Sequence, residues 1–334
     1  MLAGYRVIDV HHHFLPRQVF NQLKAEAGGA RRLVNDKISM TLNEDLYNID
    51  SHLRDMDTAQ VDAAILTNSG VSILGPDTCR KLNDGFAEIQ RQGKGRLYGS
   101  VHVAIQDPAS APRELERGIR ELRLVAVALP ASEPGVTLDS KALGPMWRKI
   151  CELDVPVILH PALLPQNAST DYGLERSCFR PFDTTLAAVR IMCGVFPEFP
   201  KLKFVLPHLG GTSVFLRGRI AMVFEPVGWQ DPSKQKGLSR VASEQRAAGL
   251  DEIFSELWGK FYFDTAGTGA WRLAVQWTAE EVTPARMLFG SDYPLEAQSG
   301  ETVRELVEMV AGLRLRRDEL QAIAGRNAEQ LFRL

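Results

Sequence analysis

Five of the seven histidines in this 334-residue chain follow short apolar runs, the position at which parallel-strand barrels carry their chemistry. They are His11, His12, His13, His160 and His208, and the runs read VIDVHHHFLP, VILHP and FVLPHLGG. A fourth run, LFGSDYP, carries Asp292 in the same position. Residues i and i+2 of an extended segment face the same side, so His11 and His13 are predicted to point together while His12 points away.

This pattern predicts one divalent metal ion held by His11, His13, His160 and Asp292. Three imidazoles and a carboxylate suit Zn²⁺ best, Mn²⁺ is chemically compatible, and a catalytic site leaves one position to water. The predicted fourth strand, LRLVAVALP, has no lysine that could be carbamylated to bridge two metals. A mononuclear site is therefore expected, with Asp292 counted in the catalytic set as well as among the ligands.

His208 can be read in two ways. It is either a fifth ligand or a general acid and base, and we favour the second because the four ligands and a water already complete a mononuclear shell. Asp9, in the first run, either orients a ligand histidine or is a buried structural carboxylate. The remaining histidines, His12, His52 and His102, are predicted to be structural.

Eight short β-rich apolar runs alternate with helical patterns along the chain, which indicates parallel strands joined by crossover helices. The runs are 5–10, 62–67, 97–103, 124–129, 156–160, 202–206, 261–264 and 286–290. The helical windows include 51–60, 77–92, 111–121, 142–152, 184–196, 301–313 and 316–331. We therefore predict an α/β fold, a (β/α)8 TIM barrel with its chemistry at one mouth. The alternative is a doubly wound open sheet, but no glycine fingerprint follows the first run.

One domain over residues 1–334 is the economical interpretation, because the chain shows no repeat, low-complexity tract or Pro/Gly linker. The connection 14–50 after the first run is too long to be a turn. Connections of that length are usually lids or substrate walls, so we expect a lid insertion there.

The composition favours a small-molecule ligand. A formal net charge of -2 gives no field that would gather nucleic acid or anionic lipid. The four cysteines form no CxxC pair, the amino terminus has no signal-peptide pattern, and no apolar run approaches the ~20 residues of a membrane span. We therefore expect a soluble, cytoplasmic protein that binds a small-molecule carboxylate and neither nucleic acid nor membranes.

At these residues the chain resembles the amidohydrolase superfamily, in particular the branch of α-amino-β-carboxymuconate-ε-semialdehyde decarboxylase and related aromatic-acid decarboxylases. The resemblance covers most of the chain. It is carried by the motifs IDVHHHFLP, LRDMDTAQVDAAIL, HPALLP, DTTLAAVRIMCGVFPEFPKLKFVLPHLGG, FLRGRI and MLFGSDYP.

The resemblance implies a divalent metal, usually zinc and sometimes manganese, on the four predicted ligands. It also implies that His208 activates water or moves a proton. Arg219, in the GRI motif, resembles an arginine that reaches a neighbouring subunit's site and binds a substrate carboxylate, which implies a homodimer or higher homo-oligomer. The family's other arginine, in the segment after the first strand, has no convincing match around residues 37–43.

These observations predict a metal-dependent nonoxidative decarboxylase of a carboxylated aromatic, heteroaromatic or muconate-type compound, as in aromatic catabolism. The metal would anchor a substrate oxygen or water, with His208 as acid and base and Arg219 as the binder of an anionic group. A hydrolase of a lactone or of a C–C bond in a ring-cleavage product would need the same residues. A noncatalytic metal-binding protein is the third alternative.

Overall fold

Eight parallel strands form the centre of the molecule, in the order β1-β4-β5-β6-β9-β10-β11-β12. The computed structural model describes residues 4–35, 37–162, 171–224, 250–267 and 271–334. The strands of this sheet are β1 (Ile8–His13), β4 (Ala63–Thr67), β5 (Leu97–His102), β6 (Ala126–Pro130), β9 (Val157–His160), β10 (Phe204–Leu206), β11 (Phe261–Asp264) and β12 (Met287–Leu288). Each overlaps one of the eight predicted runs, so the predicted strand order along the chain is confirmed.

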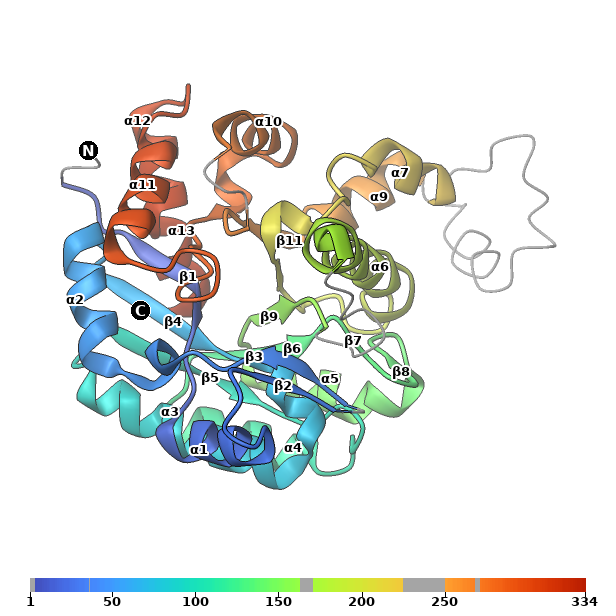
Figure 1. Ribbon diagram of the computed structural model, residues 1–334. Coiled ribbons are helices and arrows are strands. Elements are labelled where there is room, and N and C mark those ends of the chain that lie inside the picture. The colour runs from blue at the N-terminus through green and yellow to red at the C-terminus, as the bar shows by residue number, and fades with distance from the viewer. Residues whose placement is uncertain (1–3, 36, 163–170, 225–249, 268–270) are drawn as a thin grey trace.

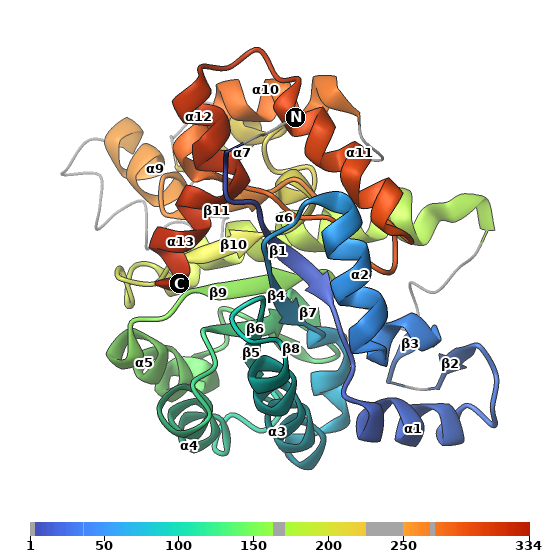
Figure 2. The same ribbon diagram turned by 90° about the vertical axis from the view of Figure 1, so that its left-hand side faces the viewer.

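Helices surround the sheet (Figures 1 and 2). They are α2 (Ile49–Ala59), α3 (Pro76–Gln92), α4 (Ala111–Glu116), α5 (Gly144–Leu153), α6 (Arg180–Arg190), α7 (Arg217–Phe224), α9 (Leu250–Trp258), α10 (Arg272–Val282), α11 (Gly300–Ala311), α12 (Arg317–Gln321) and α13 (Asn327–Phe332). Short turns of other helix types, such as η7 (Glu175–Phe179) and η9 (His208–Gly210), extend or connect them, and a small hairpin of β7 (Ser132–Glu133) and β8 (Val136–Thr137) follows β6.

The first and last strands close the sheet into a barrel. The amide of Val10 donates to the carbonyl of Phe289 at 2.9 Å, and the amide of His13 donates to the carbonyl of Tyr293 at 2.7 Å. His12 and Tyr293 also form an isolated parallel bridge. A (β/α)8 barrel is therefore confirmed, and the doubly wound open sheet is excluded because its edge strands would not meet.

Apolar side chains, most of them small or branched, fill the barrel interior below the mouth. This cluster of buried residues comprises Ile8, Val10, Ala63, Ile65, Ala126, Ile158, Val205, Leu288, Ala328, Leu331 and Phe332. The last three belong to α13, so the carboxyl-terminal helix packs against the inner layer of the strands. A packed interior leaves the carboxyl ends of the strands as the place for a site.

The connection after β1 folds into its own small elements. They are α1 (Arg17–Glu26), the antiparallel hairpin of β2 (Arg32–Val34) and β3 (Ser39–Thr41), and the turn η1 (Glu44–Tyr47). They occupy the predicted insertion 14–50, whose role as a lid stays a prediction, as does the single domain over 1–334. Among the described residues, no helix is long and apolar enough to cross a membrane.

Candidate metal centre and active site

An irregularity in β1 determines which histidines enter the barrel mouth. Val10 belongs to the packed interior, so strict alternation would turn the next side chain outward. The pairing of β1 with β4 instead shifts register between Asp9 and His12. A bulge of this kind lets two successive side chains share a face, so Val10 and His11 both point inward. His13 then follows on the same side, while His12 points away.

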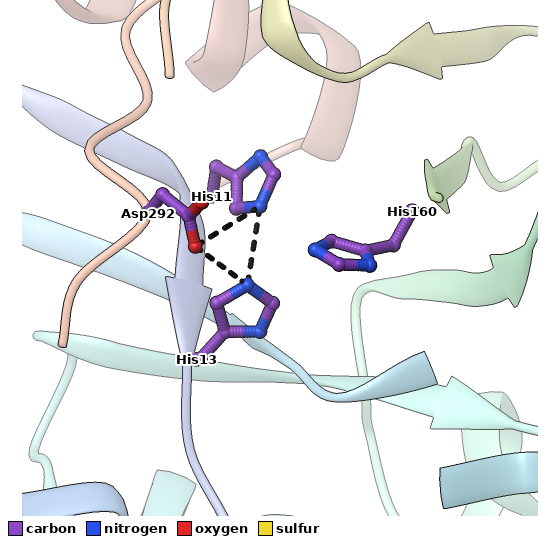
Figure 3. A group of neighbouring side chains, drawn as sticks. All are labelled: His11, His13, His160 and Asp292. Carbon is purple, nitrogen blue, oxygen red and sulfur yellow. Dashed lines mark hydrogen bonds and ion pairs between the residues drawn. The ribbon is translucent and has the colours of Figure 1, made fainter. Parts of the chain in front are cut away.

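The structure brings the four predicted ligands together at the carboxyl ends of three strands (Figure 3). Nε2 of His11 lies 3.2 Å from Nε2 of His13, and Oδ1 of Asp292 lies 2.9 Å from Nε2 of His13. Oδ1 of Asp292 is 3.8 Å from Nε2 of His11. His160 faces this group from β9, and one ligand atom from each residue lies within 4.8 Å of all the others.

These separations fit a shared metal ion. Nitrogen and oxygen ligands about 2.0–2.1 Å from one tetrahedral ion lie about 3.3 Å apart. All four side chains are buried, and within the described part of the chain Nε2 of His160 and Oδ1 of Asp292 have no hydrogen-bond partner. Buried polar atoms are costly to leave unpaired, so their convergence favours a bound cation at this point.

Two of the ligand imidazoles are held by a hydrogen bond through their other nitrogen. Nδ1 of His11 lies 2.8 Å from Oδ2 of Asp264, and Nδ1 of His160 lies 2.9 Å from the carbonyl oxygen of Pro161. A proton on Nδ1 leaves the lone pair of Nε2 free for a metal, which is the usual arrangement of a ligating histidine. Both rings are therefore oriented before any ion binds.

Burial and the charged neighbours of each group together determine the protonation of the cluster. It lowers the pKa of His160 well below its usual value and also lowers the pKa of His13, so both are neutral near pH 7. Burial alone would lower the pKa of His11 as well, but the charge and hydrogen bond of Asp264 outweigh it and raise that pKa to about 9. Burial would raise the pKa of Asp292, but the imidazoles of His13 and His208 that face the carboxylate hold that pKa well below its usual range.

His208 stands at the rim of this group. Its Nε2 is 3.4 Å from Oδ2 of Asp292, and the side chain is 11% exposed, whereas that of Asp292 is 1% exposed. The backbone turns sharply here, with a φ of 55° at His208, and its amide donates to Oδ1 of Asp264 at 2.8 Å. A Cβ on Gly267 would lie 2.6 Å from the His208 ring, so glycine leaves room for the imidazole. His208 can thus reach both the cluster and a molecule in the mouth.

The outward-facing His12 belongs to a closed chain of buried hydrogen bonds. Its Nδ1 lies 2.8 Å from Oδ2 of Asp9, and its Nε2 lies 2.8 Å from Nδ1 of His52. Nε2 of His52 in turn lies 2.7 Å from the carbonyl oxygen of Asp45. Asp9 also accepts hydrogen bonds from the amides of His11 and Ser291. Asp9 therefore contacts the backbone of a predicted ligand and not its imidazole, which favours a structural carboxylate over one that orients the ligand ring.

Arg219 lies exposed on α7 and is not part of the cluster. Asp264 was not assigned a role from the sequence, although it is the last residue of a predicted strand. It is fully buried and joins His11 to the backbone of His208. The signal was present, because an acidic residue at the carboxyl end of a barrel strand faces the site.

Comparison with known proteins gives relatives over the whole barrel. A gamma-resorcylate decarboxylase of Polaromonas sp. is 25% identical over 321 residues, covering 90% of this chain and 92% of the relative. The decarboxylase orsB of Emericella nidulans is 26% identical over 275 residues, or 77% of each chain.

Solved structures show the same fold. The 5-carboxyvanillate decarboxylase LigW of Sphingomonas paucimobilis superimposes with a TM-score of 0.78 at 23% identity, covering 99% of this chain and 100% of that one. The corresponding enzyme of Novosphingobium aromaticivorans, solved with manganese and a nitrobenzoic acid, gives 0.77 at 20% identity over 99% and 97%. The amidohydrolase family model matches residues 8–334, and the chain therefore belongs to the amidohydrolase family.

Proposed function

We propose that the protein is a metal-dependent carboxy-lyase that removes CO₂ without oxidation from a carboxylated aromatic, heteroaromatic or muconate-type small molecule. The observation that carries this proposal is the buried His/Asp cluster with His208 at its rim, 3.4 Å from Asp292. The names of the relatives support the reaction type, since they are decarboxylases of aromatic acids.

We propose one divalent ion per chain on His11, His13, His160 and Asp292. Three nitrogens and one carboxylate oxygen suit Zn²⁺, and Mn²⁺ is supported by the manganese in a similar structure. Such an ion supplies a Lewis acid that holds an oxygen of the substrate beside the scissile carboxylate.

The chain's own residues then move the proton. His208 donates a proton to the carbon that bears the carboxylate, the C–C bond breaks, its electron pair returns to the organic product, and CO₂ leaves. The carboxylate of Asp292 faces this imidazole, with Oδ2 3.4 Å from Nε2 of His208, and its charge keeps the ring directed into the mouth. Asp264 fixes the same histidine from its backbone side. His208 regains its proton from solvent after the product leaves.

A hydrolase could use the same residues, with His208 removing a proton from water. The two reactions differ in where solvent oxygen goes. A panel of hydroxybenzoates, carboxymuconate semialdehydes and lactones, followed for CO₂ release and for ¹⁸O uptake from water, separates them. We expect CO₂ release without ¹⁸O in the organic product. Solvent oxygen in a carboxylate product, without CO₂, would establish the hydrolase.

We further propose that the protein works as a homodimer or larger oligomer. Large apolar side chains are exposed on neighbouring elements: Phe182 is 52% and Leu186 56% exposed on α6, Phe215 is 79% exposed, and Trp277 is 42% exposed on α10. The rings of Phe215 and Trp277 lie 6.1 Å apart, so these two form one exposed patch beside the exposed side chains of α6. Exposed apolar patches of this kind favour a protein partner, and a second copy presents the same patch.

Arg219 on the neighbouring helix α7 would then lie near the contact between copies. Light scattering should give a mass of at least two chains. If Arg219 completes a neighbour's site, mixed inactive Arg219→Ala and His208→Ala chains should regain part of the activity after subunit exchange. Mixed oligomers without any activity would show that Arg219 does not act across the contact.

We further propose that the protein works in the cytoplasm, as expected of an enzyme that acts on a small metabolic acid.

A further inference from the structure

A cleft beside the metal centre carries four arginines. Its walls are the β2–β3 hairpin, which contributes Arg31 and Arg32, and the segment from η7 into α6, which contributes Arg176 and Arg180. Its floor includes Pro294 and Leu295. The cleft therefore lies between the insertion after β1 and the segment that follows β12.

The floor of the cleft is directly connected to the metal centre. The amides of Leu295 and Glu296 both donate to the carbonyl oxygen of Asp292, each at 2.9 Å. The chain thus makes one tight turn, with a predicted metal ligand at its start and the cleft floor immediately after it. Asp292 belongs to the metal cluster and Leu295 lines the cleft, so this turn is shared by both.

The cleft has an excess of positive charge. Among its lining residues, Glu175 is the one carboxylate facing four guanidinium groups. One oxygen of Glu175 lies 3.1 Å from Arg32, and the other lies 2.7 Å from Arg180. This bridge links the hairpin to α6 and accounts for one negative charge, which leaves the cleft positive.

Arg180 has bonding capacity that the protein does not use. Its side chain is 15% exposed, and within the described residues its buried Nε has no hydrogen-bond partner. Arg31 and Arg176 are exposed at the edge of the cleft. A purely structural role explains the Glu175 bridge, but it leaves a buried N–H of a cation without an acceptor, which is costly.

We propose that this cleft binds a second carboxylate of the substrate, distant from the one that leaves. The inference rests on the proposed function and narrows its substrate class to aromatic or muconate-type acids with at least two carboxylates. The planar guanidinium of arginine binds a carboxylate through two parallel hydrogen bonds, which adds geometric selectivity to charge. Arg180 and Arg176 would provide these donors from the α6 wall.

The test measures binding without turnover. Isothermal titration of the manganese-loaded protein compares benzoate with isophthalate, which differs by one added carboxylate. We expect isophthalate to bind at least about tenfold more tightly, as one charge-assisted contact would give. Arg176→Gln and Arg180→Gln should each remove most of this preference and leave benzoate binding unchanged. Arg148→Gln, which changes an exposed arginine on α5 outside the cleft, is the matched control and should keep the preference.

The outcomes are distinct. Equal affinities for benzoate and isophthalate, or an unchanged preference in Arg176→Gln, would overturn the inference. Arg176 is exposed, so this variant tests the cleft even if Arg180→Gln fails to fold. Inorganic phosphate should compete with isophthalate, whereas phosphate that binds without weakening isophthalate would indicate a separate anion site and overturn the proposal.

Failure of the cleft and failure of the proposed reaction can be told apart. An arginine-dependent preference for isophthalate in an enzyme that releases no CO₂ from any acid in the panel would remove the decarboxylase and leave the cleft. CO₂ release from monocarboxylates, with no effect of the arginine variants on binding, would support the decarboxylase and remove the proposed carboxylate site in the cleft.

Discussion

His11 and His12 are neighbours in one strand, yet their imidazoles lie in opposite kinds of environment. His11 joins a group in which buried atoms of His160 and Asp292 have no hydrogen-bond partner among the described residues. His12 lies in a chain in which both ring nitrogens are satisfied, one by Asp9 and one by His52. Both regions are fully buried, so burial alone does not distinguish a site from a structural network.

The two groups differ in whether their polar atoms have hydrogen-bond partners. The closed chain around His12 satisfies itself, and a ligand would have to break existing hydrogen bonds to enter it. The cluster around His11 has lone pairs directed at one point, and a cation there removes the cost of burying them. Unsatisfied atoms that converge, and not the presence of histidine, mark the site.

The largest expected difference is between alanine variants at two adjacent positions, His13 in the metal cluster and His12 in the hydrogen-bonded chain. His13→Ala removes a predicted ligand, so metal content should fall from about one per chain to near zero, and activity should be lost with it. His12→Ala should keep the metal, although it removes one hydrogen bond each from Asp9 and His52 and should cost about 1–3 kcal/mol of stability. Elemental analysis and urea unfolding of both variants check this. Stoichiometric metal loss in His12→Ala would contradict the distinction.

His208→Ala separates binding from chemistry. Because His208 is cast as acid and base and stands outside the four ligands, this variant should retain metal while turnover falls by about 10²–10⁴. The measurement combines metal analysis with the rate of CO₂ release. If the variant instead loses its metal, His208 is a ligand and the cluster has five members.

Asp264→Asn sharpens the comparison by changing a residue that touches a ligand but not the metal. The carboxylate accepts from Nδ1 of His11 at 2.8 Å, and partners of this type contribute about 10–100-fold to metal affinity. We expect a loss of that size in competition with a chelating indicator, with the metal still bound at saturation. Unchanged affinity would mean that backbone contacts alone orient His11.

The smallest expected effect concerns His102, which resembles His12 because both of its ring nitrogens have hydrogen-bond partners. His102 accepts from the amide of Asn68 at 2.9 Å and donates to the carbonyl of Ser100 at 3.1 Å, and burial lowers its pKa to about 3. The unfolded chain takes up a proton near pH 6.5 and the folded chain does not, so stability is lost as the pH falls below 6.5. Between pH 7.5 and 5 the metal-free protein should lose about 2 kcal/mol through this residue.

The measurement is urea unfolding of the metal-free wild type and of His102→Gln at both pH values. The difference in unfolding free energy between the two proteins should shrink by that amount at pH 5. Parallel pH dependence in the two proteins would show that His102 does not stay neutral in the fold.

The barrel was predictable because its strands are continuous apolar runs, and each predicted run overlaps a strand of the sheet. The end of β1 was less predictable from the sequence. The run was predicted to end at Val10, but the strand continues to His13, and its bulge depends on pairing with β4, which lies 50 residues or more away in the chain. Local spacing correctly gave the relation between His11 and His13 without showing the irregularity that turns them inward.

The contacts of Asp264 and the arginine cleft illustrate what sequence alone could not give. The place of Asp264 at the end of a predicted strand indicated that it faces the site, but its contact with His11 appears only when β11 and β1 flank β12 in the closed barrel. Arg32 comes from an insertion and Arg180 from the start of a helix, and Glu175, which joins them, is 143 positions from Arg32 in the sequence. Such groupings arise from tertiary contacts, so spacing carries no trace of them.

The seam between β1 and β12 makes the metal centre a product of the whole chain. Asp9 and Ser291, which hydrogen-bond across it, are 282 positions apart, and the predicted ligands come from both of its sides. During synthesis the first two ligands leave the ribosome long before Asp292 exists, so a complete site cannot form until the last strand has been made. An ion that binds only the closed barrel would stabilise the contact between the first and last strands. Removing it should therefore destabilise the seam between β1 and β12 first.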